Sequence, residues 1–417
     1  MRKKRSVKKR PWARRVKRLV EPIQAFIQKE TSGGVILLLS AGAALSLANS
    51  PWSQLYQRVW HEPLTIGWGK FSLTEPLSFW INDGLMSFFF FVVGLEIKRE
   101  LWVGELSSLS LAVLPIMGAL GGMVVPAGIY AIFNHGAAGA AGWGIPIATD
   151  IAFSLGVLTV LGKRVPFSLR VFLVALAIAD DIGAILVIAL WYTGRVSWMG
   201  ITAAIVLFSL AAALSRSGPR SQAVYALLGA GIWLALLKSG VEPTIAGVML
   251  AMTIPVRSDL LDDASNPSSL AGAPRPSPAA LLEEALHPWV AFGVMPIFAL
   301  SNAAVGFSKI ALLSALYHPV SLGIALGLIL GKPLGISVFA WLAVRSGLAK
   351  LPSRVSWRQL FAAACLGGIG FTMSLFVAHL AFGSEGLLSV AKIGILGGSL
   401  VSAVAGGVLL NRASRSR

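Results

Sequence analysis

The chain has few charged residues and almost no cysteine. Of its 417 residues, 13% are charged and only Cys365 is a cysteine. Because soluble domains have about 25% charged residues, an ordinary soluble domain and a disordered chain are both excluded. A single cysteine cannot form an intrachain disulfide, so a disulfide scaffold is excluded too. The phosphate-binding loop of ATP-driven pumps, Gly-x-x-x-x-Gly-Lys-Ser/Thr, is also missing, and we expect no enzyme activity and no cofactor.

The positive charge is concentrated at one end. A formal net charge of +17 would suggest nucleic acid if it covered one face of a domain. However, residues 1–18 hold eleven basic residues and no acid, and the other 399 residues carry only +6. We therefore expect no nucleic-acid partner. The basic tail is the only feature that would support nucleic-acid binding. The tail fits either a topology signal or a contact with anionic lipid headgroups.

Long apolar runs fill the rest of the chain. A straight crossing of a bilayer takes about 20 apolar residues, and about twelve spans are predicted. They are residues 33–49, 77–95, 109–133, 144–161, 168–192, 198–214, 221–237, 244–256, 287–305, 320–345, 359–381 and 388–410. Alternation with a period of two is missing from whole spans, which disfavours a β-barrel. We predict an all-α polytopic membrane protein.

The loop charges indicate the orientation of these spans. With the N-terminus in the cytoplasm, 28 of the 35 basic residues lie on the inside and six on the outside, as the positive-inside rule requires. We predict a cytoplasmic tail 1–32, a transmembrane domain 33–410 with a Ser/Pro/Ala-rich cytoplasmic connector 257–286, and a cytoplasmic tail 411–417. A cleaved signal peptide ending near Ala48 is less favoured, because the basic segment before it is too long and cleavage leaves an odd number of spans.

A segment of one outside loop has the pattern of a β-hairpin. In residues 64–73 apolar residues alternate on both sides of a Gly-Lys pair. An isolated hairpin is marginally stable in water, so we expect it to pair with something, for example a second copy of itself. An irregular loop on the membrane surface is the alternative.

Five ionisable residues fall at mid-span depth, namely Asp83, Asp150, Asp180, Asp181 and Lys332. Each costs about 2.5–3.5 kcal/mol at the centre of a membrane helix. A purely structural set would balance its charges, whereas this one has four acids and one base. Neighbours on a helix point about 100° apart, so one carboxylate of the adjacent pair can face a cavity and the other a partner helix. Such a pair can hold a proton or a hard cation in competition, which is typical of ion/proton exchange. A lysine at this depth implies either an acidic partner or an amine that loses its charge.

Two predicted spans are interrupted at membrane depth. Residues 144–153 contain Pro146, Thr149 and Asp150, and residues 366–374 contain three glycines and Thr372. Each lies in the middle of a group of three spans. Irregular backbone at that depth is tolerated only inside protein or beside a water-filled cavity. Paired interruptions therefore predict two discontinuous, crossing helices in inverted-topology repeats, with a binding site between them. Close packing through glycine is the alternative.

These residues resemble the NhaA-type bacterial sodium/proton antiporters, from about Ser32 to Leu409. The resemblance rests on Ile81-Asn82-Asp83-Gly84, Gly94-Leu95-Glu96-Ile97-Lys98-Arg99-Glu100-Leu101, Ala148-Thr149-Asp150-Ile151-Ala152, Ala179-Asp180-Asp181-Ile182-Gly183-Ala184, His287-Pro288-Trp289-Val290, Gly331-Lys332-Pro333-Leu334-Gly335 and Gly368-Ile369-Gly370-Phe371-Thr372-Met373-Ser374. It implies an electrogenic antiporter of the bacterial inner membrane that expels Na⁺ or Li⁺ for external protons by alternating access, for sodium and pH homeostasis.

The resemblance also implies roles for individual residues. Asp181 is expected to be the principal carboxylate for Na⁺ and protons, with Asp180 beside it, salt-bridged to Lys332 in one state. Thr149 contributes an oxygen, and Asp150 and Lys332 compensate the half-helix ends, an acid at N-termini and a base at C-termini. Lys332 is also a possible proton carrier.

The resemblance also implies roles for residues outside the ion site. The pH-sensing candidates at the cytoplasmic mouth are Glu96, Glu100, Glu283 and His287. Asp83 is an accessory intramembrane acid, and the hairpin 64–73 is expected to join a homodimer in the lipid bilayer.

The chain departs from this family in two places. Many relatives have His where this chain has Glu242, and the connector 257–286 is longer and lacks a basic cluster before Glu283. The dependence of activity on pH is therefore the implied property that these departures affect most. A Na⁺-coupled symporter of an organic anion and a cation channel with a static acidic filter are alternative functions. The small apolar residues around the acids offer few donors to an organic solute, which disfavours the symporter.

Overall fold

The computed structural model describes residues 30–67, 69, 72–161, 165–194, 196–216, 222–256, 277–306 and 309–415. The predicted tail up to residue 29, the connector residues 257–276 and the last two residues lie outside this part. The helices in chain order are α2 (Glu30–Ala48), α3 (Ser53–His61), α4 (Leu77–Phe79), α5 (Met86–Trp102), α6 (Leu109–Asn134), α7 (Ile151–Leu161), α8 (Phe167–Trp191), α9 (Trp198–Arg216), α10 (Gln222–Ser239), α11 (Ile245–Thr253), α12 (Pro278–Trp289), α13 (Met295–Asn302), α14 (Lys309–Leu316), α15 (Pro319–Leu326), α16 (Lys332–Arg345), α17 (Trp357–Gly367), α18 (Phe371–Ala381) and α19 (Glu385–Arg415). The strands are β1 (Pro63–Ile66) and β2 (Leu73–Pro76), the 3₁₀ turns are η3 (Glu105–Ser107) and η4 (Ala140–Ile147), and the π-helical turns are η2 (Trp80–Leu85), η7 (Val290–Val294) and η8 (Gly327–Gly331).

The all-helical prediction is confirmed, but the count of twelve spans is not. Within the described residues, eight helices are long and apolar enough to cross a membrane, and ten if each of two bent pairs is one span. The bent pairs are α2 with α3, at 114°, and α17 with α18, at 45°. The predicted span 244–256 contains α11, a helix of nine residues, which rises only about 14 Å. The predicted span 287–305 is divided between α12, η7 and α13.

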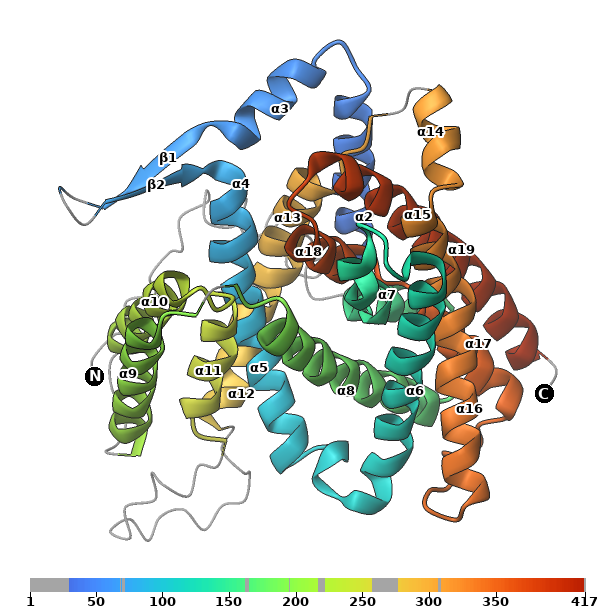
Figure 1. Cartoon of the computed structure of the whole chain (residues 1–417). Helices are drawn as coiled ribbons and strands as arrows, with labels where there is room; N and C mark the ends of the chain where they lie inside the picture. The colour runs from blue at the N-terminus through green and yellow to red at the C-terminus, as the bar shows by residue number, and fades with distance from the viewer. Residues whose placement is uncertain are drawn as a thin grey trace, which may run out of the picture.

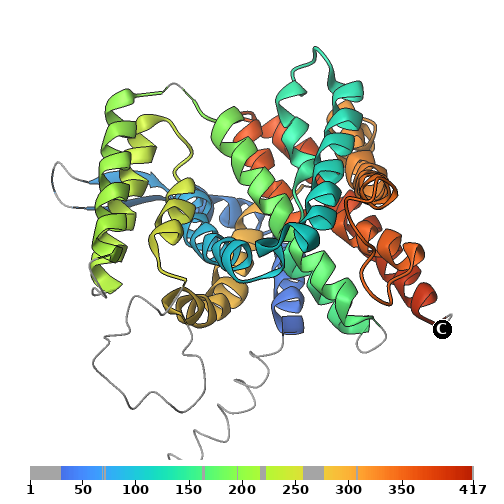
Figure 2. The same cartoon turned by 90° about the horizontal axis from the view of Figure 1, so that it is seen from below.

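The helices form one bundle in which the broken segments are central. The long helix α6 packs against both α16 and α8, α15 and α17 pack on α19, and α11 packs on α5. Figure 2 shows α9 and α10 at one edge and the orange-to-red helices of the C-terminal part at the other. Most of the buried apolar side chains belong to a single core cluster. The short helices are therefore held by surrounding long ones.

The contact between α6 and α16 depends on two glycines. A Cβ added at Gly121 would collide with the carbonyl oxygen of Gly335, and a Cβ at Gly335 would collide with that of Gly121. Small residues allow such close backbone approach in membrane bundles. Directly before α16 the helix widens into the π turn η8, a feature frequent at functional sites. The crossing and the turn together place Lys332, the first residue of α16, fully inside the bundle.

The predicted hairpin is confirmed. Strands β1 and β2 are antiparallel, with Leu64 opposite Glu75 and Ile66 opposite Leu73. They project from the edge of the bundle, and α3 leads into them (Figure 1). The indole Nε1 of Trp80 donates to the carbonyl oxygen of Leu64 at 3.0 Å, which fixes the hairpin to the start of the second span. All four residues of β1 are exposed, so this edge is open to a partner.

Candidate functional site

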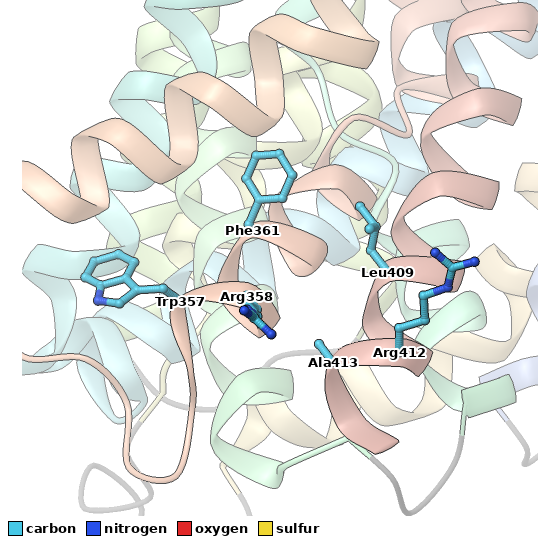
Figure 3. A pocket seen from close by; sticks show the side chains of 6 residues that line it. All are labelled: Trp357, Arg358, Phe361, Leu409, Arg412 and Ala413. Carbon is cyan, nitrogen blue, oxygen red and sulfur yellow. The ribbon is translucent and has the colours of Figure 1, made fainter. Parts of the chain in front are cut away.

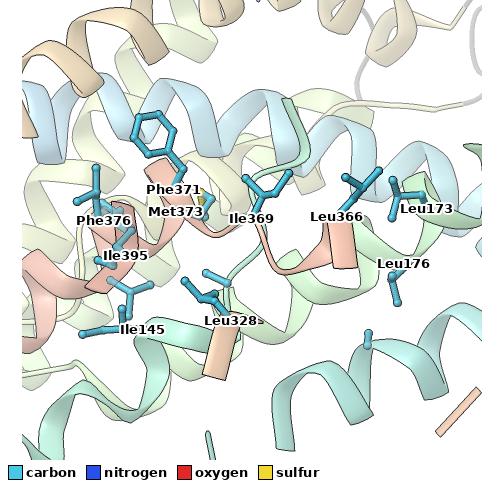
Figure 4. Packing of buried hydrophobic residues seen from close by; sticks show 14 of the residues in the cluster. Ile145, Leu173, Leu176, Leu328, Leu366, Ile369, Phe371, Met373, Phe376 and Ile395 are labelled. Atoms are coloured by element: carbon cyan, nitrogen blue, oxygen red, sulfur yellow. The ribbon is translucent and has the colours of Figure 1, made fainter. Parts of the chain in front are cut away.

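The two interrupted spans cross at their breaks. In the first, η4 and α7 are separated by the extended residues 148–150, and in the second, α17 and α18 are separated by residues 368–370. The backbone N–H of Asp150 donates to the carbonyl oxygen of Ile369 at 2.7 Å, which joins the two breaks directly. Figure 4 shows Ile369 on the non-helical stretch between the helix ends that carry Leu366 and Phe371. The apolar cluster around this stretch shields the irregular backbone from lipid.

The N-terminal ends of α7 and α18 meet one carboxylate. Asp150 Oδ1 accepts from the backbone N–H of Phe153 at 2.9 Å, and Oδ2 accepts from the backbone N–H of Thr372 at 3.2 Å and from its hydroxyl. Asp150 is 1% exposed. A carboxylate satisfies free N–H groups and opposes the positive end of a helix dipole. The structure therefore places Asp150 at the two half-helix N-termini for which the sequence proposed it.

Serine and threonine satisfy the remaining backbone groups at the crossing. Ser399 Oγ accepts from the N–H groups of Gly370 and Phe371. At the C-terminal end of α17, Ser154 donates to the carbonyl oxygen of Leu366 and Thr149 to that of Gly367. Sequence reasoning missed the capping roles of Ser399 and Ser154, because a serine in an apolar span gives no signal of the backbone it faces. Lys332, expected to compensate half-helix C-termini, contacts other groups.

A buried ion pair lies beside this crossing. Lys332 Nζ is 2.5 Å from Asp180 Oδ2 and 2.7 Å from Thr149 Oγ1, and both charged side chains are at most 1% exposed. Thr149 Oγ1 is also 2.7 Å from Asp180 Oδ2 and 2.9 Å from the carbonyl oxygen of Gly367. A hydroxyl has one proton, so Thr149 can donate to only one of these two acceptors at a time. The hydroxyl thus links the ion pair to the broken helix.

The neighbouring carboxylates keep oxygens available. Asp180 Oδ1 is buried and has no hydrogen-bond partner among the residues that the structure describes. Asp181 is 3% exposed, and no hydrogen bond to its carboxylate is found within the described residues. Its electrostatic neighbours are Glu96, Asp180, Lys332 and Asp150. In the described part of the chain, no three acid, imidazole or thiol side chains gather into a metal site, so a cation here would complete its shell with water, hydroxyl or carbonyl oxygens.

The expected mouth residues lie on two helices. Arg99 of α5 is 3.4 Å from Glu100 Oε1 and 3.3 Å from Glu283 Oε1 of α12. Glu96 lies one turn before Glu100 on α5, half-buried. His287 follows Glu283 by one turn and is exposed. The structure thus brings Glu100 and Glu283 together at Arg99, with Glu96 one turn away on α5. His287 extends this cluster toward the surface.

Two further acids lie away from the crossing. Asp83 is in the π turn η2, and its electrostatic neighbours are Glu242 and Glu75. Glu242 lies in the loop between α10 and α11 and is 8% exposed. Its Oε1 accepts from the Thr244 hydroxyl at 3.0 Å. Burial raises the pKa of Glu242 from 4.5 to about 7, although the hydrogen bonds from Thr244 oppose the rise.

The raised pKa of Glu242 predicts a dependence of stability on pH. Between the unfolded value of 4.5 and the folded value of about 7, the folded protein keeps its proton while the unfolded chain loses it. Stability is therefore lost as pH rises through this window, by about 3 kcal/mol in total. Glu242→Gln removes this loss. In thermal unfolding, the stability of the variant relative to the wild type should therefore be higher at about pH 8.5 than at about pH 4.5. An equal difference between variant and wild type at both values would contradict the assignment.

Two broken helices that cross over buried carboxylates and a buried lysine define a class of protein, the secondary membrane transporters. The family profile described as "Na+/H+ antiporter 1" matches residues 24–410. The chain is 50% identical to "Na(+)/H(+) antiporter NhaA" of Koribacter versatilis (strain Ellin345), over 95% of this chain and 92% of the relative. It is 48% identical to the protein of the same name from Rhodospirillum rubrum, over 95% of this chain and 98% of the relative. The chain belongs to the NhaA family of Na⁺/H⁺ antiporters.

Proposed function

We propose that this protein exchanges Na⁺ for protons across the membrane, with Asp181 and Asp180 as the shared ion site. The observation that carries the proposal is the pair of adjacent buried carboxylates at the crossing, one held by Lys332 and one without a hydrogen-bond partner in the described part of the chain. A carboxylate that is unpaired in a dry site is neutralised either by a proton or by a cation. The two ligands then exclude each other, and exclusion is what couples their movements.

The cycle follows from the contacts around Asp180. In the arrangement seen here Lys332 occupies Asp180 Oδ2. A Na⁺ ion that binds Asp181 and Asp180 competes with the ammonium, and Thr149 can turn its hydroxyl oxygen toward the cation. Asp181 carries one proton in the return step, and either Asp180 or Lys332 carries a second. More protons than sodium ions therefore move in each cycle, which makes the exchange electrogenic, and Li⁺, another small hard cation, is a second substrate.

The crossing of the broken helices also supports alternating access. Asp150, Ser154 and Thr149 of the first interrupted span form hydrogen bonds with the second, and Ser399 of α19 accepts from the break of the second. Such a site can open to one side at a time when one inverted repeat moves against the other. With the cytoplasmic side assigned by the basic loops, the antiporter expels Na⁺ and admits external protons. It is then a multi-pass protein of the bacterial inner membrane that serves sodium and pH homeostasis.

Reconstitution in sealed vesicles tests this function. A pH gradient with an acidic interior is imposed, and the internal pH is followed as NaCl, LiCl, KCl or choline chloride is added outside. An antiporter dissipates the gradient with Na⁺ or Li⁺ and not with choline. A channel carries Na⁺ without moving protons, and a symporter needs an organic anion. If no cation-dependent proton movement is found at any assay point from about pH 6 to about pH 9, the proposal is contradicted.

The cluster on α5 and α12 is proposed to regulate the exchange. Arg99 bridges Glu100 and Glu283 from two different helices, and Glu96 connects the cluster electrostatically to Asp181. A change of protonation in this cluster alters the contact between α5 and α12 and the field at the ion site. His287 lies exposed at the end of the cluster, one turn after Glu283 on α12.

The hairpin is proposed to join two copies of the chain. Leu64 and Ile66 are 42% and 52% exposed on β1, and an open edge with apolar side chains is a ready template for another strand. Deleting residues 64–73 should therefore give a monomer that still exchanges ions. Light scattering after size exclusion, in a detergent where the wild type is dimeric, measures this. A deletion variant that stays dimeric refutes the role.

A further inference from the structure

A groove lies far from the ion site, between the start of α17 and the end of α19. It has a volume of about 450 Å³ and is lined by Trp357, Arg358, Phe361, Leu409, Arg412 and Ala413. Figure 3 shows Arg358 and Phe361 on one helix, and Arg412 and Leu409 on the facing helix. The groove therefore has a cationic mouth and an apolar interior.

The position of the groove matches the surface of a bilayer. α17 begins at Trp357 and α19 ends at Arg415, so the groove lies where two spans leave the membrane. At this level the polar headgroups meet the hydrocarbon, and tryptophan is enriched there. Trp357 is 38% exposed, and Phe361 and Leu409 are exposed to a similar extent, 39% and 37%. The lining is thus accessible from outside the bundle.

Neither arginine has an acidic partner among the described residues. Within the described part of the chain, no salt bridge or hydrogen bond is found for the guanidinium of Arg358 or of Arg412, and both residues are exposed. Arginine forms bidentate hydrogen bonds with phosphate oxygens. The first turn of α17 adds the positive end of a helix dipole on the same side. The positive charge of Arg358 and Arg412 therefore complements the negative charge of a phosphate group.

We propose that this groove binds a phospholipid with an anionic headgroup. Its phosphate lies between Arg358 and Arg412, and one acyl chain lies along Phe361 and Leu409. A soluble anion would use the arginines and leave the apolar walls exposed, whereas a lipid satisfies both at once. The bound lipid connects α17, the first half of a broken span, to α19, which caps the second half through Ser399. With the orientation taken under the proposed function, the site lies in the cytoplasmic leaflet.

Native mass spectrometry of the whole delipidated protein tests the proposal, with phosphatidylglycerol and phosphatidylcholine as the probes. We expect preferential binding of phosphatidylglycerol, and about tenfold weaker binding in each of Arg358→Gln and Arg412→Gln, because each loses one charge-assisted contact. Arg415→Gln is the matched control, since it lies on the same helix, is exposed and does not line the groove. It should bind phosphatidylglycerol as the wild type does.

Three results of these binding measurements would overturn the proposal. They are equal binding of both lipids, unchanged affinity in both groove variants, and an equal loss in Arg415→Gln, which would indicate general attraction to a basic surface. Competition by inorganic phosphate as strong as that by the lipid would also overturn it in favour of a free-anion site. Ion exchange by the groove variants in vesicles shows that they are folded. The proposed ion site is tested separately, because Asp181→Asn should bind the lipid normally.

Discussion

Replacing Asp181 with Asn is expected to abolish Na⁺-dependent proton movement in sealed vesicles. The amide has nearly the same shape as the carboxylate, but it neither carries a negative charge for the cation nor takes up a proton. Because both ligands are assigned to the same oxygens, the rate should fall to that of vesicles without protein. The change should leave folding intact, since no hydrogen bond to this side chain is found within the described residues.

Asp83→Asn is the matched control for this variant. It replaces another acid of a membrane span, in the turn η2, whose electrostatic neighbours are Glu242 and Glu75 and not the acids of the crossing. Exchange should therefore stay well above background. Wild-type rates in Asp181→Asn would remove that residue from the centre of the mechanism.

Replacing Lys332 with Met is expected to lower the free energy of unfolding by about 3–5 kcal/mol, the cost of leaving one charge of a buried pair without its partner. The methionine fills a similar volume, but Asp180 then keeps only the Thr149 hydroxyl as a partner. Thermal unfolding in detergent at neutral pH measures the loss.

A second replacement identifies the cause of this loss. In the double variant Lys332→Met with Asp180→Asn no charge is left unpaired, so most of the stability should return. Lys350→Met, which removes an exposed lysine, should change stability by less than about 0.5 kcal/mol. If the single and double variants are equally unstable, packing of the lysine stem and not its charge is responsible.

Local features were predictable where the residue type itself forces a structure. Apolar alternation around a Gly-Lys pair predicted the hairpin, because side chains alternate with a period of two in a strand and with a period of 3.6 in a helix. The interruptions at 144–153 and 366–374 were visible because proline and glycine runs cannot continue a helix at low cost. A lysine deep in an apolar span implied an acidic partner or the loss of its charge, and the structure has the first, with Asp180 at 2.5 Å.

Other features depend on contacts between segments distant in sequence. Ser399 accepts a hydrogen bond from the backbone N–H of Gly370, 29 residues away in the sequence. No pattern in an apolar helix predicts such a bond. The count of twelve spans is not confirmed within the described residues, because hydropathy measures apolar length and not helical continuity. The nine residues of α11 are as apolar as a span but end at Thr253. The electrostatic contact of Glu242 with Asp83 likewise joins it to η2, far earlier in the chain.

Proton release on Na⁺ binding tests the central claim most directly. The purified protein is held in a weakly buffered detergent solution near neutral pH, NaCl is added, and the pH change is recorded against choline chloride. If Na⁺ and protons compete for Asp181 and its neighbour, the wild type releases protons in proportion to the sodium bound, and Asp181→Asn releases none. Sodium binding without proton release, or equal release by the variant, would contradict a shared site.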